Sequence, residues 1–124
     1  MNIYDAGVFI AAGRGDHAMW KRVKDSLAQG SHPVTSTAVL AQVWRGDPRQ
    51  ANLARLAQVV DTVPLTDTAA RRVGKLLGRS GTSDVVDAAL MIAAADGDVI
   101  YTSDPEDMAH LAMTLGLDVE IIRV

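Results

Sequence analysis

Short apolar segments with strand character alternate with helix-like segments along the whole chain, and this alternation constrains the fold more than any other feature. The predicted strands cover residues 2–4, 33–35, 62–65, 99–102 and 119–124. Strands that are separated by helices usually run parallel, with the connecting helices packed on both faces of the sheet. We therefore predict an α/β protein with three layers, α/β/α, around a central and mostly parallel sheet.

The predicted helices combine apolar residues at helical spacing with a capping or breaking residue at the start. They begin near Asp16, Pro48, Asp84 and Ser103, and two more begin at a cap that is either Ser36 or Thr37 and either Thr66 or Asp67. The helix over residues 84–95 is apolar nearly all round, which is typical of a buried helix. The strand over 62–65 contains Pro64, which favours an edge position because proline cannot donate to a neighbouring strand.

Length and composition favour one domain over residues 1–124, with 48% apolar residues to build its core. The chain has no cysteine, so disulfides, thiolate zinc sites and cysteine nucleophiles are excluded. No segment approaches the about 20 apolar residues of a membrane span. The apolar run Val8–Ala12 is too short for a signal peptide and has no basic leader. We expect a cytoplasmic protein without a membrane partner.

The net charge of −3 is unevenly distributed along the sequence. Residues 14–79 contain 11 of the 12 Lys and Arg residues against five aspartates, and the rest of the chain is strongly acidic. A basic region beside a carboxylate cluster suits a protein that holds a polyanion. Solvated helix faces of opposite sign would produce the same distribution.

Three aspartates occupy positions where a lone carboxylate is unexpected. Asp5 directly follows the first strand, Asp104 follows the strand over 99–102, and Asp87 lies on the predicted buried helix. Ligands of parallel sheets gather at the carboxyl ends of the strands. A buried charge needs a partner, and Mg²⁺ or Mn²⁺ prefers carboxylate oxygens. The three residues together therefore predict a metal site.

Each acid also has a purely structural explanation. Asp5 would simply end a strand, and Asp104, which precedes a proline, would cap a helix. Asp87 would pair with Arg71 or Arg72.

Two further acids lie close in sequence to this set. Asp84 is expected to cap the helix that carries Asp87, and it shares a helix face with that residue. Asp107 lies one turn after Asp104, where it would reach the ion or favour the helix dipole.

At these residues the sequence resembles the PIN-domain ribonucleases, especially the VapC-type toxins of bacterial toxin–antitoxin pairs. The segment Ile3–Ile10 resembles the opening strand and first acid of the family, and Thr82–Ala88 resembles the segment with the third acid. The segment Val99–Asp107 resembles the final acidic motif. The resemblance implies an endoribonuclease that depends on Mg²⁺ or Mn²⁺, is restrained by a cognate antitoxin protein and often forms a homodimer.

The sequence departs from the family at its second acid. The family has a glutamate where this chain has Gln42, within the segment Ser36–Arg45. An amide oxygen still binds a metal, but it adds no negative charge. Weakened activity is therefore expected, and the alternative is a degenerate PIN-like module that binds RNA or an antitoxin without cleaving.

In the nuclease hypothesis Asp5, Asp87 and Asp104 are catalytic and bind the metal together with Asp107. Gln42 and Asp84 are weak ligands or support the ligands. The ion would activate a water and neutralise charge on the phosphate. Arg14, Lys21, Arg45 and Arg49 are candidates for holding the RNA backbone.

The same residues do not fit two other classes of α/β protein. A phosphotransfer receiver needs paired acids at the first strand and a lysine after the last strand, and this chain has neither. A haloacid-dehalogenase-type phosphatase needs an acid two residues after Asp5, where Gly7 stands. For a protein partner, Trp20 and Trp44 are the candidate anchors, unless both belong to the core.

Overall fold

Five short strands form one fully parallel sheet in the computed structural model, which describes all 124 residues. The strands are β1 (Asn2–Tyr4), β2 (Val34–Ser36), β3 (Asp61–Val63), β4 (Val99–Thr102) and β5 (Glu120–Arg123). Their order in the sheet is β3-β2-β1-β4-β5, and every neighbouring pair is parallel. The predicted parallel sheet is confirmed, and so is the edge position of the strand that precedes Pro64.

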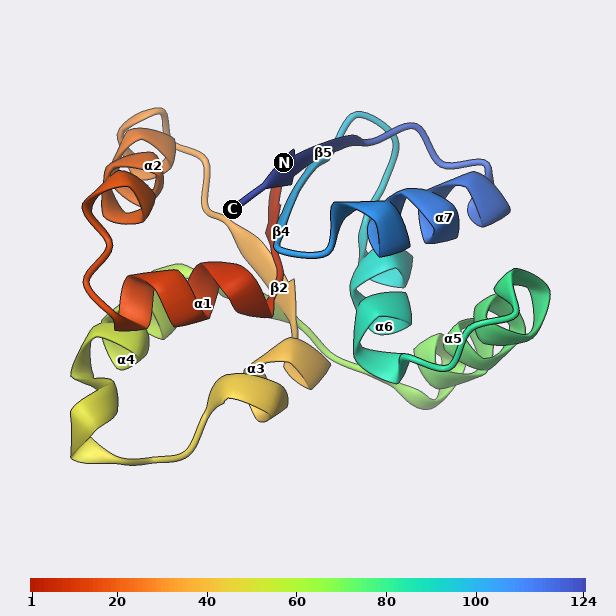
Figure 1. Cartoon of the computed structure of the whole chain (residues 1–124), viewed down its shortest axis with the longest axis horizontal. Coiled ribbons are helices and arrows are strands. Elements are labelled where there is room, and N and C mark those ends of the chain that lie inside the picture. The colour runs from red at the N-terminus through yellow and green to blue at the C-terminus, as the bar shows by residue number, and fades with distance from the viewer.

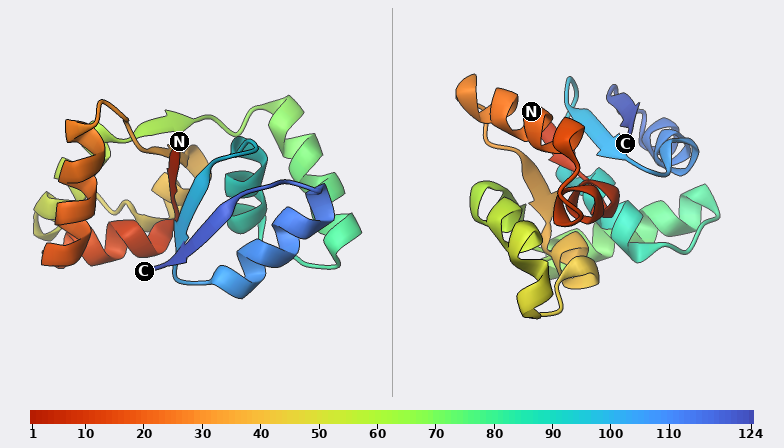
Figure 2. Two further views of the ribbon diagram at one scale, coloured as in Figure 1. Left: turned by 90° about the horizontal axis from the view of Figure 1, so that it is seen from above. Right: turned by 60° about the vertical axis from the view of Figure 1, so that its left-hand side comes forward.

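Seven α-helices and one 3-10 turn connect and cover the strands. They are α1 (Ala6–Gly13), α2 (His17–Ala28), α3 (Thr37–Val43), η1 (Pro48–Gln50), α4 (Ala51–Val59), α5 (Asp67–Ser80), α6 (Val85–Ala93) and α7 (Pro105–Leu115). Helices α1, α2 and α4 lie on one side of the sheet, and α5, α6 and α7 lie on the other (Figure 1). The view from above shows the same division (Figure 2). This arrangement is the predicted three-layer α/β/α domain.

The predicted capping residues are confirmed at four helices. The side chains of Asp16, Ser36, Thr66 and Asp84 each accept a hydrogen bond from a backbone N–H in the first turn of the helix that follows. Such bonds satisfy amide groups that a helix start leaves unpaired. These helix starts are therefore determined by local sequence.

The core consists of side chains from the central strands and from the inner faces of the helices. Ile3, Tyr4 and Ile100 on β1 and β4 are fully buried, as are Phe9 on α1 and Leu90 on α6. No helix of the structure is long and apolar enough to cross a membrane.

Three details differ from the sequence-based prediction. Helix α1 was not predicted, because residues 6–12 are apolar on every side and lack the periodicity that distinguishes a helix from a short buried run. The sequence predicts a turn over residues 78–83, but helix α5 continues past Gly78 to Ser80 and is capped by Gly81, whose φ is 70°. Helix α6 is buried over Ala88–Met91, but Val85 at its start is 48% exposed.

Candidate active site

The carboxyl ends of β1 and β4 lie side by side at the centre of the sheet. The chain order reverses between these strands, since β2 and β3 lie beyond β1 while β5 lies beyond β4. Ligands of open parallel sheets bind at such a reversal. Asp5 follows β1 and Asp104 follows β4 after one intervening residue. The first turns of α1, α6 and α7 face this point (Figure 1).

Asp5 is a buried carboxylate, only 3% exposed, at the start of α1. The Ala6 N–H donates to its Oδ1 at 2.7 Å, and the Thr102 hydroxyl donates to its Oδ2 at 2.6 Å. Burial raises the pKa of Asp5, and these two hydrogen bonds oppose that rise because they favour the ionised form. Asp5 therefore does more than end a strand: both of its oxygens are held in place.

The Thr102 hydroxyl joins two of the predicted site residues. It donates to Asp5, and its oxygen accepts a hydrogen bond from the Asp104 N–H at 3.0 Å. Thr102 is fully buried. From the sequence, Thr102 is predicted only as a strand residue, because nothing local shows that its hydroxyl faces a carboxylate 97 residues away. A polar residue on a buried strand next to an acidic motif is the signal that was available.

We expect Thr102→Val, which keeps the shape of the side chain, to lower the free energy of unfolding at pH 7 by about 1–3 kcal/mol. The loss arises because a buried carboxylate oxygen loses its donor, and the pKa of Asp5 should rise further for the same reason. The measurement is urea unfolding of the variant and of the unmodified protein across pH. The matched control is Thr35→Val, since Thr35 is equally buried but donates to the Tyr4 backbone carbonyl at 2.7 Å. Equal effects of both variants on the pH dependence of stability would show that Thr102 does not act on the Asp5 carboxylate.

Asp84 and Asp87 lie on the first turn of α6. The Asp87 N–H donates to Asp84 Oδ1 at 3.0 Å, which confirms Asp84 as the helix cap. Burial raises the pKa of Asp87 to about 7, and repulsion from Asp84, Asp5, Asp104 and Asp107 adds to the shift. The charge of Asp87 is therefore repelled by every other acid of the predicted site.

The predicted alternative pairing of Asp87 with an arginine is wrong. Arg71 instead pairs with Asp67 one turn away on α5, at 3.1 Å, and Asp87 takes part in no ion pair. The half-buried carboxylate thus has no cation to compensate it.

Asp104 and Asp107 are both exposed near the start of α7. Asp104 occupies the N-cap position of α7, as its structural explanation predicted, but its side chain accepts no capping hydrogen bond and is left free. Asp107 lines a cleft of about 240 Å³ together with Asp84 and Asp87. The cleft lies between the starts of α6 and α7.

Asp5, Asp84, Asp87, Asp104 and Asp107 are called the acid cluster below. None of the five ion pairs of the protein includes a member of this cluster. Its donors are all carboxylate oxygens, the type that Mg²⁺ and Mn²⁺ prefer, and its negative charge is uncompensated. The donor chemistry therefore fits a hard divalent ion. No three of the side chains, however, lie close enough in this conformation to hold one ion together.

Gln42 lies near the end of α3, exposed and without a hydrogen bond from its side chain to the protein. It lines a separate cavity of about 390 Å³, whose wall also contains Ala6 next to Asp5. The structure therefore places Gln42 in a cavity that reaches Ala6, the neighbour of Asp5 in the chain, and not in the cleft of Asp84, Asp87 and Asp107.

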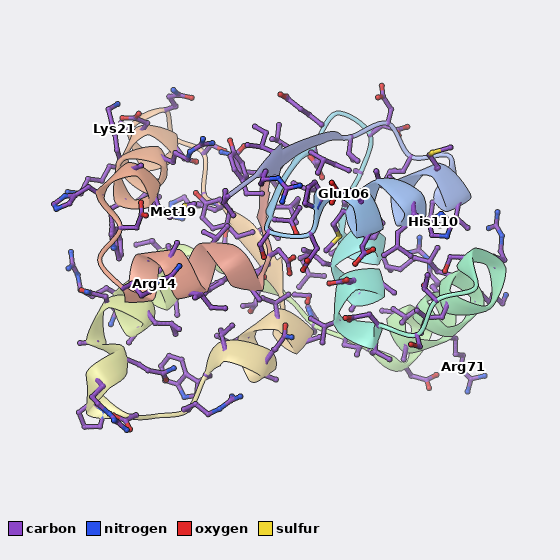
Figure 3. The ribbon with its side chains drawn as sticks, viewed as in Figure 1. Arg14, Met19, Lys21, Arg71, Glu106 and His110 are labelled. Carbon is purple, nitrogen blue, oxygen red and sulfur yellow. The ribbon has the colours of Figure 1, made fainter.

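The four basic candidates do not form one surface. Arg45 and Arg49 line the same cavity as Gln42. Arg14 lies at the far end of α1 from Asp5. Lys21 lies on the outer part of α2, where it pairs with Asp25 at 2.8 Å (Figure 3). Of the four, only Arg45 and Arg49 line the cavity that reaches Ala6.

The two tryptophans have different environments. Trp20 packs against the core, its Nε1–H donates to the Ala12 carbonyl at 3.0 Å, and the Arg55 guanidinium lies over its ring. Trp44 is 44% exposed and lines an apolar groove of about 520 Å³ with Leu40. Trp44 alone remains a candidate anchor for a protein partner.

Comparison with known proteins identifies the fold. No family model matches the chain, and no curated protein matches its sequence. Among solved structures, the chain is similar to the structure described as VapBC2 from Rickettsia felis bound to a DNA fragment from its promoter. The TM-score is 0.70 at 11% sequence identity, and the match covers 97% of each chain. The structural similarity agrees with the parallel sheet and with the acids at the ends of β1 and β4. The chain therefore has the VapC-like PIN fold.

Proposed function

We propose that the protein is an endoribonuclease of the VapC toxin type that depends on Mg²⁺ or Mn²⁺. The observation that carries this proposal is the acid cluster. Five carboxylates from the starts of three helices surround the reversal point of a PIN-like sheet, and no cation of the protein compensates them. Such a cluster costs folding energy, which bound metal would recover.

In this proposal Asp5, Asp87 and Asp104 hold the ion, and Asp107 contributes from the rim of the cleft. A bound Mg²⁺ or Mn²⁺ supplies an activated water and neutralises charge on the scissile phosphate. Asp5 is kept in orientation by Thr102 and Ala6, so its carboxylate is positioned before metal arrives. Asp87 must release its proton to act as a ligand, and its raised pKa makes metal loading depend on pH near neutrality.

The proposal includes partners. The neighbouring structure is a VapBC complex, and we propose that this chain also pairs with a cognate antitoxin protein. The exposed Trp44 and its apolar groove are candidates for that contact. A homodimer and a cytoplasmic location belong to the same proposal.

A second candidate function is a PIN-like module that binds RNA or an antitoxin without cleaving. Two observations favour it: Gln42 brings no charge to the site, and no three acids lie close enough to hold one ion without rearrangement. Arg45 and Arg49, which line the same cavity as Gln42, would contribute to binding whether the ligand is RNA or an antitoxin.

The proposal is tested by incubating the purified protein with end-labelled single-stranded RNA in Mn²⁺, in Mg²⁺ and in EDTA. We expect cleavage with either metal, none in EDTA, and a loss of about 100-fold or more in Asp5→Asn. Asp25→Asn is the control, because Asp25 is exposed on α2 outside the cluster. RNA that is bound but stays intact with both metals would favour the second candidate. Cleavage that persists in EDTA would contradict the metal-dependent mechanism.

A further inference from the structure

The cavity of about 390 Å³ beside the acid cluster has a size and place that suit part of a nucleic acid. It lies between α1, α3 and the segment η1–α4. Ala6 belongs to its wall, and the Ala6 N–H is the group that holds Asp5 Oδ1. The cavity and the acid cluster therefore adjoin each other across the first turn of α1.

One side of this cavity is apolar. Its lining includes Phe9 and Ile10 from α1 and Leu53 from α4. Ile10 is 49% exposed, although most large apolar side chains of the protein are covered. Phe9 and Leu53 are buried and form the floor of the cavity, and Ile10 presents the exposed apolar surface that suits the flat face of a ring.

The polar side of the cavity contains one amide that the fold does not use. The Gln50 amide is fully engaged, since its Oε1 accepts the Arg45 N–H at 2.8 Å and its Nε2 donates to the Val43 carbonyl at 2.9 Å. The Gln42 amide makes no such bond. It therefore offers one donor and one acceptor side by side to a ligand.

The cavity also differs in charge from the cleft on the other side of Asp5. Arg49 is neutralised by a two-bond pair with Asp47, at 2.8 and 3.1 Å. Arg45 has no acidic partner, and its guanidinium bonds only to backbone carbonyls, such as that of Trp44 at 2.8 Å. A cation is thus free on this side, whereas the acid cluster is negative on the other.

We infer that this cavity holds one unstacked nucleobase of the RNA strand whose phosphate lies at the acid cluster. The inference rests on the proposed function in that RNA is the ligand. Recognition of single-stranded RNA commonly combines an apolar or guanidinium surface against the base face with hydrogen bonds to the base edge. Here the apolar wall receives the ring, the Gln42 amide bonds the edge, and Arg45 attracts the strand. A side-chain amide that makes two bonds to one base gives appreciable discrimination.

The test couples a protein change to an RNA change. Fluorescence anisotropy measures the affinity for a single-stranded RNA, in EDTA and again in Mg²⁺, for the unmodified protein and for Gln42→Ala. The same measurement uses RNAs in which one nucleotide at a time is abasic. Gln29→Ala is the matched control, because Gln29 is exposed beyond the end of α2 and lines neither the cavity nor the cleft.

We expect Gln42→Ala to weaken RNA binding about fivefold to tenfold, and Gln29→Ala to leave it unchanged. One abasic position should weaken binding by the unmodified protein at least as much, because it removes the ring as well as the edge that Gln42 contacts. The same abasic position should weaken binding by Gln42→Ala less than it weakens binding by the unmodified protein, because the edge contact is already lost in that variant. The inference would be overturned if the loss of affinity from Gln42→Ala and the loss from an abasic nucleotide multiplied at every position of the RNA. Equal affinities of Gln42→Ala and the unmodified protein would overturn it as well. A cavity that takes a segment of a protein partner would produce equal affinities. RNA cleavage together with equal affinities would leave the proposed function intact, whereas no RNA binding in either buffer would contradict both.

Discussion

Asp87→Asn is expected to lower RNA cleavage by about 100-fold or more, while making the metal-free protein more stable at neutral pH. The first effect follows because the substitution removes a charged oxygen ligand from the acid cluster. The second follows because Asp87 is ionised at a cost, without a cation and beside four other carboxylates. A variant that loses activity and gains stability is characteristic of a functional carboxylate and would not be expected of a structural one.

The dependence on pH follows from the direction of the shift. The pKa of Asp87 is about 7 in the folded protein and near the ordinary 3.8 in the unfolded chain. Between these values the unfolded state has released the proton while the folded state keeps it. The free energy of unfolding therefore falls as pH rises from about 4 to 7, and below about 4 the penalty is absent. Allowing for solvent screening of a half-exposed group, the penalty is about 2 kcal/mol above pH 7.

Urea unfolding in EDTA between pH 4 and 8 directly measures how the free energy of unfolding depends on pH. The Asp87→Asn protein should lose less stability over that range than the unmodified protein, and the fall that remains should belong mainly to Asp5, whose pKa is also raised. Asp25→Asn should follow the unmodified curve. If Asp87→Asn is less stable than the unmodified protein at pH 8, the carboxylate has a structural partner and its assignment to the acid cluster is wrong.

Gly7→Ala is expected to lower the free energy of unfolding by about 1–3 kcal/mol and to reduce cleavage as well. A Cβ at Gly7 would lie 2.8 Å from Ser103 Oγ, 3.1 Å from its Cβ and 3.3 Å from its backbone N. Ser103 immediately precedes Asp104, so relief of the clash must move the turn that carries this acid. Helix propensity alone would predict the opposite sign, because alanine favours a helix over glycine by about 0.5–1 kcal/mol.

Gly74→Ala provides the matched control for this prediction. Gly74 lies in the middle of α5 with open space around the added Cβ, so the substitution should stabilise the protein and leave cleavage unchanged. Adding Ser103→Gly to Gly7→Ala should restore part of the lost stability by removing the opposing side chain. Stabilisation by Gly7→Ala alone, measured by urea unfolding, would show that the turn after β4 adapts freely and does not position Asp104.

The order of strands and helices could be read from the sequence because its causes are local. Alternating apolar segments, breaking residues and caps such as Asp16, Ser36 and Thr66 act within one turn of helix or one strand. The positions of Asp5 and Asp104 after strands were equally visible. Since parallel strands present their carboxyl ends at one edge, this was enough to predict that the two acids meet. Helix α1 was not predicted from the sequence, because a helix that is apolar on every side has no periodic pattern of polar and apolar residues.

The environment of the acidic residues was decided by the tertiary structure alone. The raised pKa of Asp87 comes from burial and from carboxylates at the starts of α1, α6 and α7, and the Thr102 hydroxyl meets Asp5 only because β1 and β4 are neighbours. The close contact of Gly7 with Ser103 and the cavity beside Gln42 likewise join residues far apart in the chain. Periodicity and capping report interactions between near neighbours, whereas burial, repulsion and cavity shape depend on distances that only the packed chain defines. The sequence by itself therefore determined the layers and the edge where the acids gather, and the packing determined their hydrogen bonds, pKa values and neighbours.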